Sequence, residues 1–334
     1  MSNSKTAKDA DSAPMEQLEK VQNQLQQARE EVRSVIFGQD QALDRVFMTL
    51  MSGGHVLLIG VPGLAKTLMV ETVAKVLGLD STRIQCTPDL MPADVIGSEI
   101  LEETEKGKRS FRFVKGPVFT NLLMVDEINR ASPRTQSALL QAMQEREVSV
   151  SGHTHNLPQP FHVLATQNPL EQEGTYPLPE AQLDRFLMQI DIDYPDEDAE
   201  KQVILTTTSN VARTVKSVFK KDDLTNIQNL VRDMPVGEAV VDAILTVVRR
   251  ARPDGDAPQI VRDYVSWPPG PRASQALMLA CRAKALLDGR TAPSPDDVID
   301  LAEPVLKHRM ALNYQSRADG VTLRHIVEAL TKDI

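Results

Sequence analysis

Gly60-Val61-Pro62-Gly63-Leu64-Ala65-Lys66-Thr67 is the stretch that decides the fold of this 334-residue chain. It follows the apolar run Val56–Ile59 and leads into the helical pattern Leu68–Ala74. A strand, a glycine loop and a helix in this order bring the loop N–H groups and the positive helix end to one point, where a polyphosphate can bind. Lys66 would neutralise the β- and γ-phosphates, and the Thr67 hydroxyl would ligate Mg²⁺. An ordinary glycine turn is the alternative, and the flanking strand and helix favour phosphate binding.

The loop departs from the usual pattern at one position, because Ala65 stands where a glycine commonly precedes the lysine. A Cβ at Ala65 is expected to require a right-handed backbone. The permissive φ angles should therefore come from Gly60 and Gly63.

Composition narrows the class of protein before any further motif is considered. The net charge is −9 and the pI is near 5.3, so the surface as a whole should not attract nucleic acid or acidic membrane. Cys86 and Cys281 lie far apart, which favours buried thiols in a reducing compartment over a disulfide framework or a zinc site. No apolar run is long enough to span a membrane, and Met1 to Ala13 lacks the apolar core of a signal peptide. We expect a cytoplasmic protein.

The chain divides into three parts by composition. Residues 1–14 are rich in Ser, Lys and Asp and are predicted to be disordered. Residues 15–195 are expected to form an α/β nucleotide-binding core, and 196–334 a helical lid domain that begins after Pro195. From Met15 the apolar residues follow three- and four-residue steps, which favours an amphipathic helix docked on the body over a short coiled coil.

The core alternates apolar strands with helices. Near-continuous apolar strands of this kind indicate a parallel sheet covered on both faces, whose ligand crevice lies at the carboxyl ends of the strands. The predicted strands are Val56–Ile59, Arg83–Cys86, Leu122–Val125, His162–Thr166 and Phe186–Ile190. The predicted fold class is thus α/β, a P-loop core with a parallel sheet flanked by helices, followed by an all-α lid.

Two segments interrupt the alternation and are predicted to be inserted hairpins, at about 94–117 and 147–158. Such projecting hairpins commonly carry partner or substrate contacts. Beyond Pro195 only helical patterning is evident, and the stiff stretch Pro268–Pro271 should deliver Arg272 to the beginning of a helix.

Asp126 and Glu127 follow the third strand and should face the phosphates at the mouth of the crevice. Asp126 can hold the Mg²⁺ shell, and Glu127 can polarise a water for attack on the γ-phosphate. A solvated turn is the alternative for an Asp-Glu pair alone. The fourth strand lies beside this one and ends near Asn168, which could orient the attacking water or could merely start a turn with Pro169.

Phosphoryl transfer also needs positive charge at the γ-phosphate, and an arginine there is worth on the order of 10³–10⁵ in rate. The candidates are Arg130, Arg134, Arg146, Arg185 and Arg272. Arg185 enters the last core strand, and Arg272 sits on the helical domain, from which it could reach back over the same nucleotide. Any of them could instead be solvated or ion-paired.

Together these motifs resemble the AAA+ ATPases, and within them the MoxR family, over nearly the whole chain from Val35. The glycine loop resembles the family's Walker A form, in which alanine precedes the lysine, and the third strand its Walker B. Asn168 resembles sensor 1, Arg185 the arginine finger and Arg272 sensor 2. The hairpins resemble the helix-2 insert and the pre-sensor-1 hairpin of the clade that holds magnesium-chelatase ATPase subunits.

The resemblance implies an ATPase that binds ATP and Mg²⁺ and assembles as a homo-oligomeric ring, usually a hexamer. It further implies that Arg185 is supplied by the neighbouring subunit, and that the ring remodels a protein client with a partner carrying a von Willebrand factor A domain. Ile36–Gln39 resembles the adenine-contacting segment. The expected nucleotide-binding residues are Phe37, Gly38, Gly60, Pro62, Gly63, Leu64, Ala65, Lys66, Thr67 and Leu68, and the expected magnesium ligands are Thr67 and Asp126.

Three functions are weighed. The leading one is an ATPase that moves the lid against the core, with Arg272 sensing the γ-phosphate across a hinge. The second is a nucleotide-gated binding module with negligible turnover, against which the intact Glu127 counts. The third is a DNA-associated motor, which the acidic balance disfavours, although the first insert is locally basic at Lys106, Lys108, Arg109 and Arg112.

Overall fold

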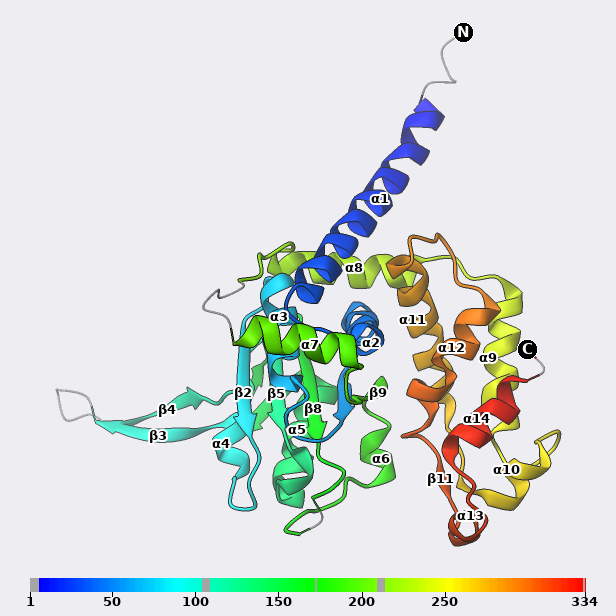
Figure 1. The fold of residues 1–334 in the computed structure, drawn as a ribbon. Helices are drawn as coiled ribbons and strands as arrows, with labels where there is room; N and C mark the ends of the chain where they lie inside the picture. The colour runs from blue at the N-terminus through cyan, green and yellow to red at the C-terminus, as the bar shows by residue number, and fades with distance from the viewer. Residues whose placement is uncertain (1–5, 104–108, 172, 209–213, 333) are drawn as a thin grey trace.

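The computed structural model describes residues 6–103, 109–171, 173–208, 214–332 and 334. Its centre is a five-stranded parallel sheet in the order β2-β5-β8-β1-β9 (Figure 1). The strands are β1 (Val56–Ile59), β2 (Ser81–Gln85), β5 (Leu122–Asp126), β8 (His162–Gln167) and β9 (Met188–Asp191). The predicted α/β class is confirmed, and β8 lies beside β5 as expected.

Helices cover both faces of the sheet because the apolar side chains of each strand alternate in direction. On β1, Leu58 belongs to one apolar cluster and Leu57 to a second. The first cluster includes residues of α2 (Asp40–Met51) and α3 (Lys66–Val76), and the second includes residues of α5 (Pro133–Glu145). Short elements complete the core: α4 (Pro92–Ile96), the 3-10 helix η1 (Ile128–Arg130) and α6 (Glu180–Leu183).

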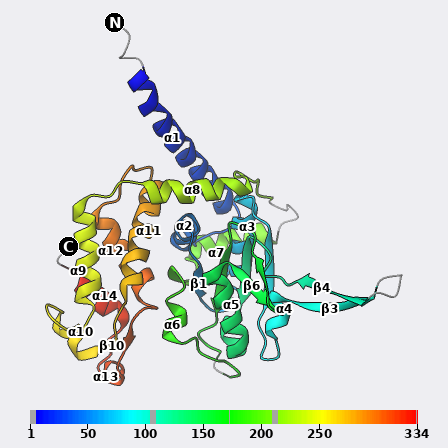
Figure 2. The same ribbon diagram turned by 180° about the vertical axis from the view of Figure 1, so that it is seen from behind.

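Both predicted hairpins are present as antiparallel pairs. The first pairs β3 (Gly97–Glu103) with β4 (Arg109–Lys115) and projects away from the body in both ribbon views (Figures 1 and 2). The second pairs β6 (Glu147–Val150) with β7 (His153–Asn156). The two hairpins meet where the His155 ring stacks on Phe113, with 3.9 Å between ring centroids.

Helix α1 (Thr6–Arg33) begins nine residues before the predicted start at Met15, so the expected disordered segment is helical from Thr6 onward. Residues 1–5 of that segment lie outside the described part. Alanine and lysine have high helix propensity, which explains why a polar composition did not prevent the helix. The helix docks on the body, as predicted, and Leu25, Ala28 and Val32 are fully buried.

The C-terminal region is helical, as predicted, with one small addition. The lid helices are α8 (Lys221–Asp233), α9 (Glu238–Arg250), α10 (Gln259–Tyr264), α11 (Pro271–Leu287), α12 (Pro295–Leu306), α13 (Tyr314–Ala318) and α14 (Leu323–Thr331). The addition is a short antiparallel pair of β10 (Val265–Trp267) and β11 (Ala311–Leu312), which the sequence reading missed. Helix α7 (Glu197–Thr207) lies over the core (Figure 1), so the lid begins later than the predicted boundary at 196.

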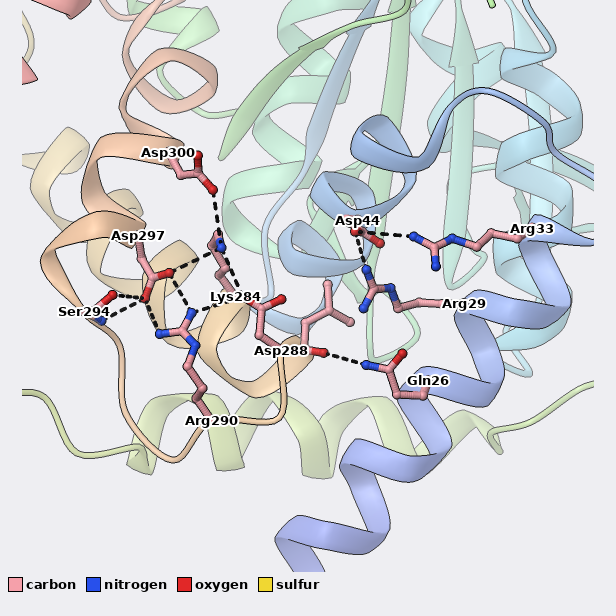
Figure 3. Close-up of polar contacts among 11 residues, drawn as sticks. Gln26, Arg29, Arg33, Asp44, Lys284, Asp288, Arg290, Ser294, Asp297 and Asp300 are labelled. Atoms are coloured by element: carbon pink, nitrogen blue, oxygen red, sulfur yellow. Dashed lines mark hydrogen bonds and ion pairs between the residues drawn. The ribbon is translucent and has the colours of Figure 1, made fainter. Parts of the chain in front are cut away.

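The lid and the core are joined by packed side chains and polar contacts as well as by the chain that connects them. One apolar cluster runs from α2 and α3 of the core into α9, α11 and α12 of the lid. Helix α1 spans the junction (Figure 3): Arg29 pairs with Asp44 of α2 at 2.5 Å, and the Gln26 amide donates to the Leu287 carbonyl of α11 at 3.2 Å. These contacts join the lid to the core in this conformation, and the expected motion of the lid against its own core stays a prediction. Within the described residues no helix is long and apolar enough to cross a membrane.

Candidate functional site

The glycine loop adopts a conformation that the sequence reading described only in part. Gly63 has a φ of +87°, as expected, but Ala65 itself is left-handed with φ 55° and ψ 20°, contrary to the prediction. The φ angle of Gly60 is not positive, which also differs from the prediction. Its role is close packing, because a Cβ there would lie 2.8 Å from the Ile192 carbonyl oxygen. The left-handed Ala65 caps α3, which begins at Lys66 as predicted.

A polar cleft of about 430 Å³ opens at the carboxyl ends of the strands, and we call it the phosphate cleft. It brings together nearly all of the predicted phosphate and metal residues. Its lining is Pro62, Gly63, Leu64, Ala65, Lys66, Thr67, Leu68, Arg83, Asp126, Glu127, Thr166 and Asn168. Burial lowers the pKa of Lys66, and Asp126 and Glu127 oppose this shift. The Lys66 ammonium donates to the carbonyls of Gly60 and Val61 at the back of the loop.

The two carboxylates are held by neighbouring strands. Thr166 of β8 donates to Asp126 at 2.5 Å and accepts the Glu127 backbone N–H at 2.9 Å. From β2, Arg83 donates to Asp126 at 2.6 Å, and Gln85 donates to Glu127 at 2.8 Å. Glu127 is left-handed with φ 54° and ψ 53°, a conformation that costs a non-glycine residue about 1–3 kcal/mol and concentrates at functional sites.

Asn168 lies at the tip of β8 in the same cleft, as predicted. Its carbonyl accepts the Leu170 N–H at 3.1 Å, and its amide lies 3.5 Å from Glu171. Arg130 contacts Glu127 at 3.3 Å and Glu171 at 3.1 Å, so this candidate arginine is an ion-paired residue of the cleft's own chain.

A second hollow of about 260 Å³ adjoins the loop on the other side of Pro62–Ala65. Phe37 lines it, together with Tyr194, Pro195 and Val203. Its largely apolar lining fits a purine base, and its position beside the phosphate cleft fits a purine nucleoside polyphosphate lying across the loop. Gly38 has a packing role, since a Cβ there would lie 2.7 Å from that of Ala199.

The remaining predicted arginines lie elsewhere in the chain. Arg185 and Arg272 line a separate hollow of about 270 Å³, together with Arg146, Asp184 and Arg309, and we call it the arginine pocket. It shares no lining residue with the phosphate cleft. Arg272 lies 3.7 Å from Asp184 where α11 begins and does not line the phosphate cleft, an arrangement that disfavours the expected reach over its own nucleotide.

The locally basic first insert is largely neutralised by its own strand pairing. Arg109 pairs with Glu103 at 3.2 Å, and Arg112 pairs with Glu102 at 3.0 Å. Lys106 and Lys108 lie outside the described residues. The described part of the hairpin thus offers little unpaired positive charge for a nucleic acid backbone.

Four residues of the site were not predicted from the sequence. Three of them lie on the strands that flank β5: Thr166 on β8, and Arg83 and Gln85 on β2. The order of the strands in the sheet would have to be known to place these residues beside the carboxylates. Tyr194 follows β9 and directly precedes Pro195, the predicted start of the domain boundary.

The sheet order, the glycine loop and the strand-end carboxylates define a P-loop protein of the AAA+ class. Residues 55–188 match the family described as "ATPase family associated with various cellular activities (AAA)", and 258–330 match "AAA lid domain". The chain is 43% identical to chaperone MoxR1 of Mycobacterium tuberculosis over 93% of this chain and 81% of that protein. It is 30% identical to protein MoxR of Paracoccus denitrificans, over 87% and 90% of the two chains.

A crystal structure of a proposed ATPase from Cytophaga hutchinsonii superposes with a TM-score of 0.88 at 37% identity, covering 98% of each chain. The chain belongs to the MoxR family of AAA+ ATPases.

Proposed function

We propose that this protein is a Mg²⁺-dependent ATPase whose complete active site forms between two copies of the chain. The observation that carries the proposal is the separation of the two sites. The phosphate cleft holds the loop lysine and both carboxylates, whereas Arg185 and Arg272 lie together in the arginine pocket. A transition state at the γ-phosphate needs both sets, so a second chain must supply the arginines.

Within the phosphate cleft the residues have distinct roles. Lys66 and the loop N–H groups hold the β- and γ-phosphates, and Thr67 and Asp126 offer the oxygen ligands that Mg²⁺ prefers. The ion, when bound, neutralises charge on the phosphates. Glu127 takes a proton from the attacking water, and Asn168 orients that water. Phe37 and Tyr194 hold the base.

We further propose that the subunits assemble head to tail into a ring, most simply a hexamer. A head-to-tail interface in which one face meets a different face closes into a ring when its rotation permits. The pairing of a phosphate cleft with a neighbour's arginine pocket is an interface of this kind. Arg185 and Arg272 would then both act on the neighbouring nucleotide.

The biological role that we propose is remodelling of a protein client, together with a partner that carries a von Willebrand factor A domain. The M. tuberculosis relative is named a chaperone, which supports this role. The first hairpin is a suitable contact because Leu101 and Phe111 face each other across it with 55% and 71% of their surfaces exposed. The two free, buried cysteines suit a reducing compartment such as the cytoplasm.

The test is phosphate release from ATP, combined with light scattering to measure mass with and without nucleotide. Wild type should hydrolyse ATP and form a ring. Glu127→Gln should keep the nucleotide and the ring but lose hydrolysis, and Glu145→Gln, an exposed carboxylate at the end of α5, should behave as wild type. A Glu127→Gln protein that hydrolyses ATP normally, or a monomer with full activity, would contradict the proposal.

A further inference from the structure

The arginine pocket contains a fourth arginine, Arg309, which the sequence did not single out. Arg309 follows α12, and only 3% of its side chain is exposed. Burial lowers the pKa of Arg309 to about 10, and the nearby Asp184 carboxylate opposes the shift, so the guanidinium stays charged at neutral pH. A buried charge of this kind is costly unless every donor finds an acceptor, which makes its partners informative.

Arg309 contacts Val305 and His308 of its own segment, and its other partners lie on both sides of Arg185. Its guanidinium donates to the Phe186 carbonyl at 2.6 Å and to the Leu187 carbonyl at 3.0 Å. It also donates to the Asp184 side chain at 2.8 Å and approaches the Asp184 carbonyl at 3.4 Å. A lid residue thus fixes the backbone of the core segment that carries Arg185.

Arg185 is half-buried and donates to the Leu140 carbonyl at 2.5 Å, and Asp184 extends the arrangement to the more exposed Arg272. One carboxylate oxygen accepts from Arg309, and the second lies 3.7 Å from Arg272, whose side chain is 51% exposed. Asp184 is therefore shared by a buried arginine that sets its orientation and a surface arginine that it restrains. Two arginines contact this one carboxylate, and Arg146 and Arg185 line the same pocket, so its arginines outnumber its carboxylates.

We propose that Arg309 and Asp184 are positioning residues that hold Arg185 and Arg272 as a preorganised pair for the nucleotide of the neighbouring subunit. The inference rests on the proposed function above. Neither residue touches the nucleotide in this account. They act by fixing two groups from different domains in one geometry, and a misplacement of about 1 Å in a catalytic group can cost on the order of 10² in rate.

The test uses two inactive proteins mixed in equal amounts. The hydrolysing subunit carries Arg185→Ala and keeps Glu127, and the donor subunit carries Glu127→Gln and keeps its arginines. Phosphate release from the mixture comes from a hydrolysing cleft that faces a donor's arginine pocket. If the mixture stays inactive although the subunits co-assemble, the proposed function fails before the positioning proposal is tested.

Asp184→Asn is then placed in one subunit at a time. In the donor subunit it should lower kcat by about 10- to 100-fold with little change in KM for ATP. In the hydrolysing subunit it should have no effect, because that arginine pocket is already disabled. Equal losses from both placements would indicate a merely structural role and overturn the proposal, as would no loss from the donor placement.

The matched control is Asp191→Asn in the donor subunit. Asp191 also joins core to lid, through an ion pair with Lys307 at 2.6 Å, but it does not line the arginine pocket. It should leave the activity of the mixture unchanged, and a loss equal to that of Asp184→Asn would overturn the proposal.

Arg309→Lys gives a second readout that does not depend on hydrolysis. Lysine keeps the positive charge, but its ammonium group cannot replace the planar guanidinium that donates hydrogen bonds to several carbonyl oxygens at once. Hydrogen exchange of the segment around residues 184–187 should accelerate in a protein that remains folded by circular dichroism. Unchanged exchange in that folded protein would contradict the fixing role assigned to Arg309.

Discussion

The phosphate cleft and the arginine pocket contain the same kinds of side chain in opposite proportions. In the phosphate cleft each carboxylate has an arginine of its own, Arg83 for Asp126 and Arg130 for Glu127. In the arginine pocket two arginines, Arg272 and Arg309, share Asp184. In the cleft, Lys66 is thus the one lining cation without a carboxylate partner among the described contacts, whereas the pocket has more arginines than carboxylates. This difference supports the proposal that each is half of a site shared between two chains.

The largest effects are expected when one cation is removed, either from the phosphate cleft or from the arginine pocket. Lys66→Ala should abolish nucleotide binding by its own subunit, because the loop loses its contact to the β- and γ-phosphates. Arg185→Ala should leave binding intact and lower hydrolysis by about 10³-fold or more. Nucleotide titration and phosphate release separate the two outcomes, with exposed Arg134→Ala as the control. Loss of binding in Arg185→Ala would place that arginine in its own cleft.

Thr166 tests whether the carboxylates of the phosphate cleft depend on precise positioning, as the arginines of the arginine pocket do in the proposal. Thr166→Val removes the hydroxyl that joins Asp126 to the Glu127 N–H without a large change in volume. We expect kcat to fall by about 10- to 100-fold. Buried Thr49→Val, whose hydroxyl bonds only to the helical carbonyl of Arg45 among the described contacts, should keep full activity. Equal activity of the two variants would remove Thr166 from the site.

Tyr194 tests the assignment of the base hollow. Base–aromatic stacking contributes about 1–3 kcal/mol, so Tyr194→Ala should raise Kd for ATP at least about fivefold. Tyr314→Ala, which removes an equally exposed ring from the lid, is the control. A Kd that does not change, measured with a fluorescent ATP analogue, would place the base elsewhere.

The smallest expected effect concerns the backbone of the loop. The left-handed conformation of Ala65 costs roughly 1–2 kcal/mol, and glycine at this position would relieve that strain. Glycine also loses more conformational freedom on folding than alanine, which costs roughly 0.5–1 kcal/mol and offsets part of the relief. Ala65→Gly should therefore raise the free energy of unfolding slightly, by at most about 1.5 kcal/mol. Ala138→Gly in the middle of α5 should lower it by about 1 kcal/mol. Denaturant unfolding of both variants measures whether each change raises or lowers the free energy of unfolding. A lower value for Ala65→Gly would contradict the proposed backbone strain at Ala65.

The sequence predicted the parts of the molecule that depend on local pattern. Strand β1, the start of α3 at Lys66 and both hairpins follow from apolar periodicity and turn residues, and the structure has them where they were expected. The carboxylates of the phosphate cleft were predictable because a parallel sheet gathers its strand ends at one edge.

The features that could not be predicted depend on distant parts of the chain. Ala65 is left-handed because the loop must turn into α3 there, whatever its side chain prefers. The place of Arg272 in the arginine pocket could not be predicted, because only the docking of the lid decides which site α11 faces. Arg309 showed no motif at all, and its meaning appears only from the carbonyls that surround it.

The central claim is that the two halves meet across a subunit boundary, and one titration tests it directly. Arg185→Ala and Glu127→Gln proteins are co-assembled at varying ratios, and phosphate release is measured at constant total protein. A shared site predicts activity that is nearly absent at both ends and largest at equal amounts, at about a quarter of the wild-type rate, since that fraction of head-to-tail interfaces pairs an intact cleft with an intact pocket. Activity that stays near zero at every ratio, in rings shown to contain both proteins, would contradict the account.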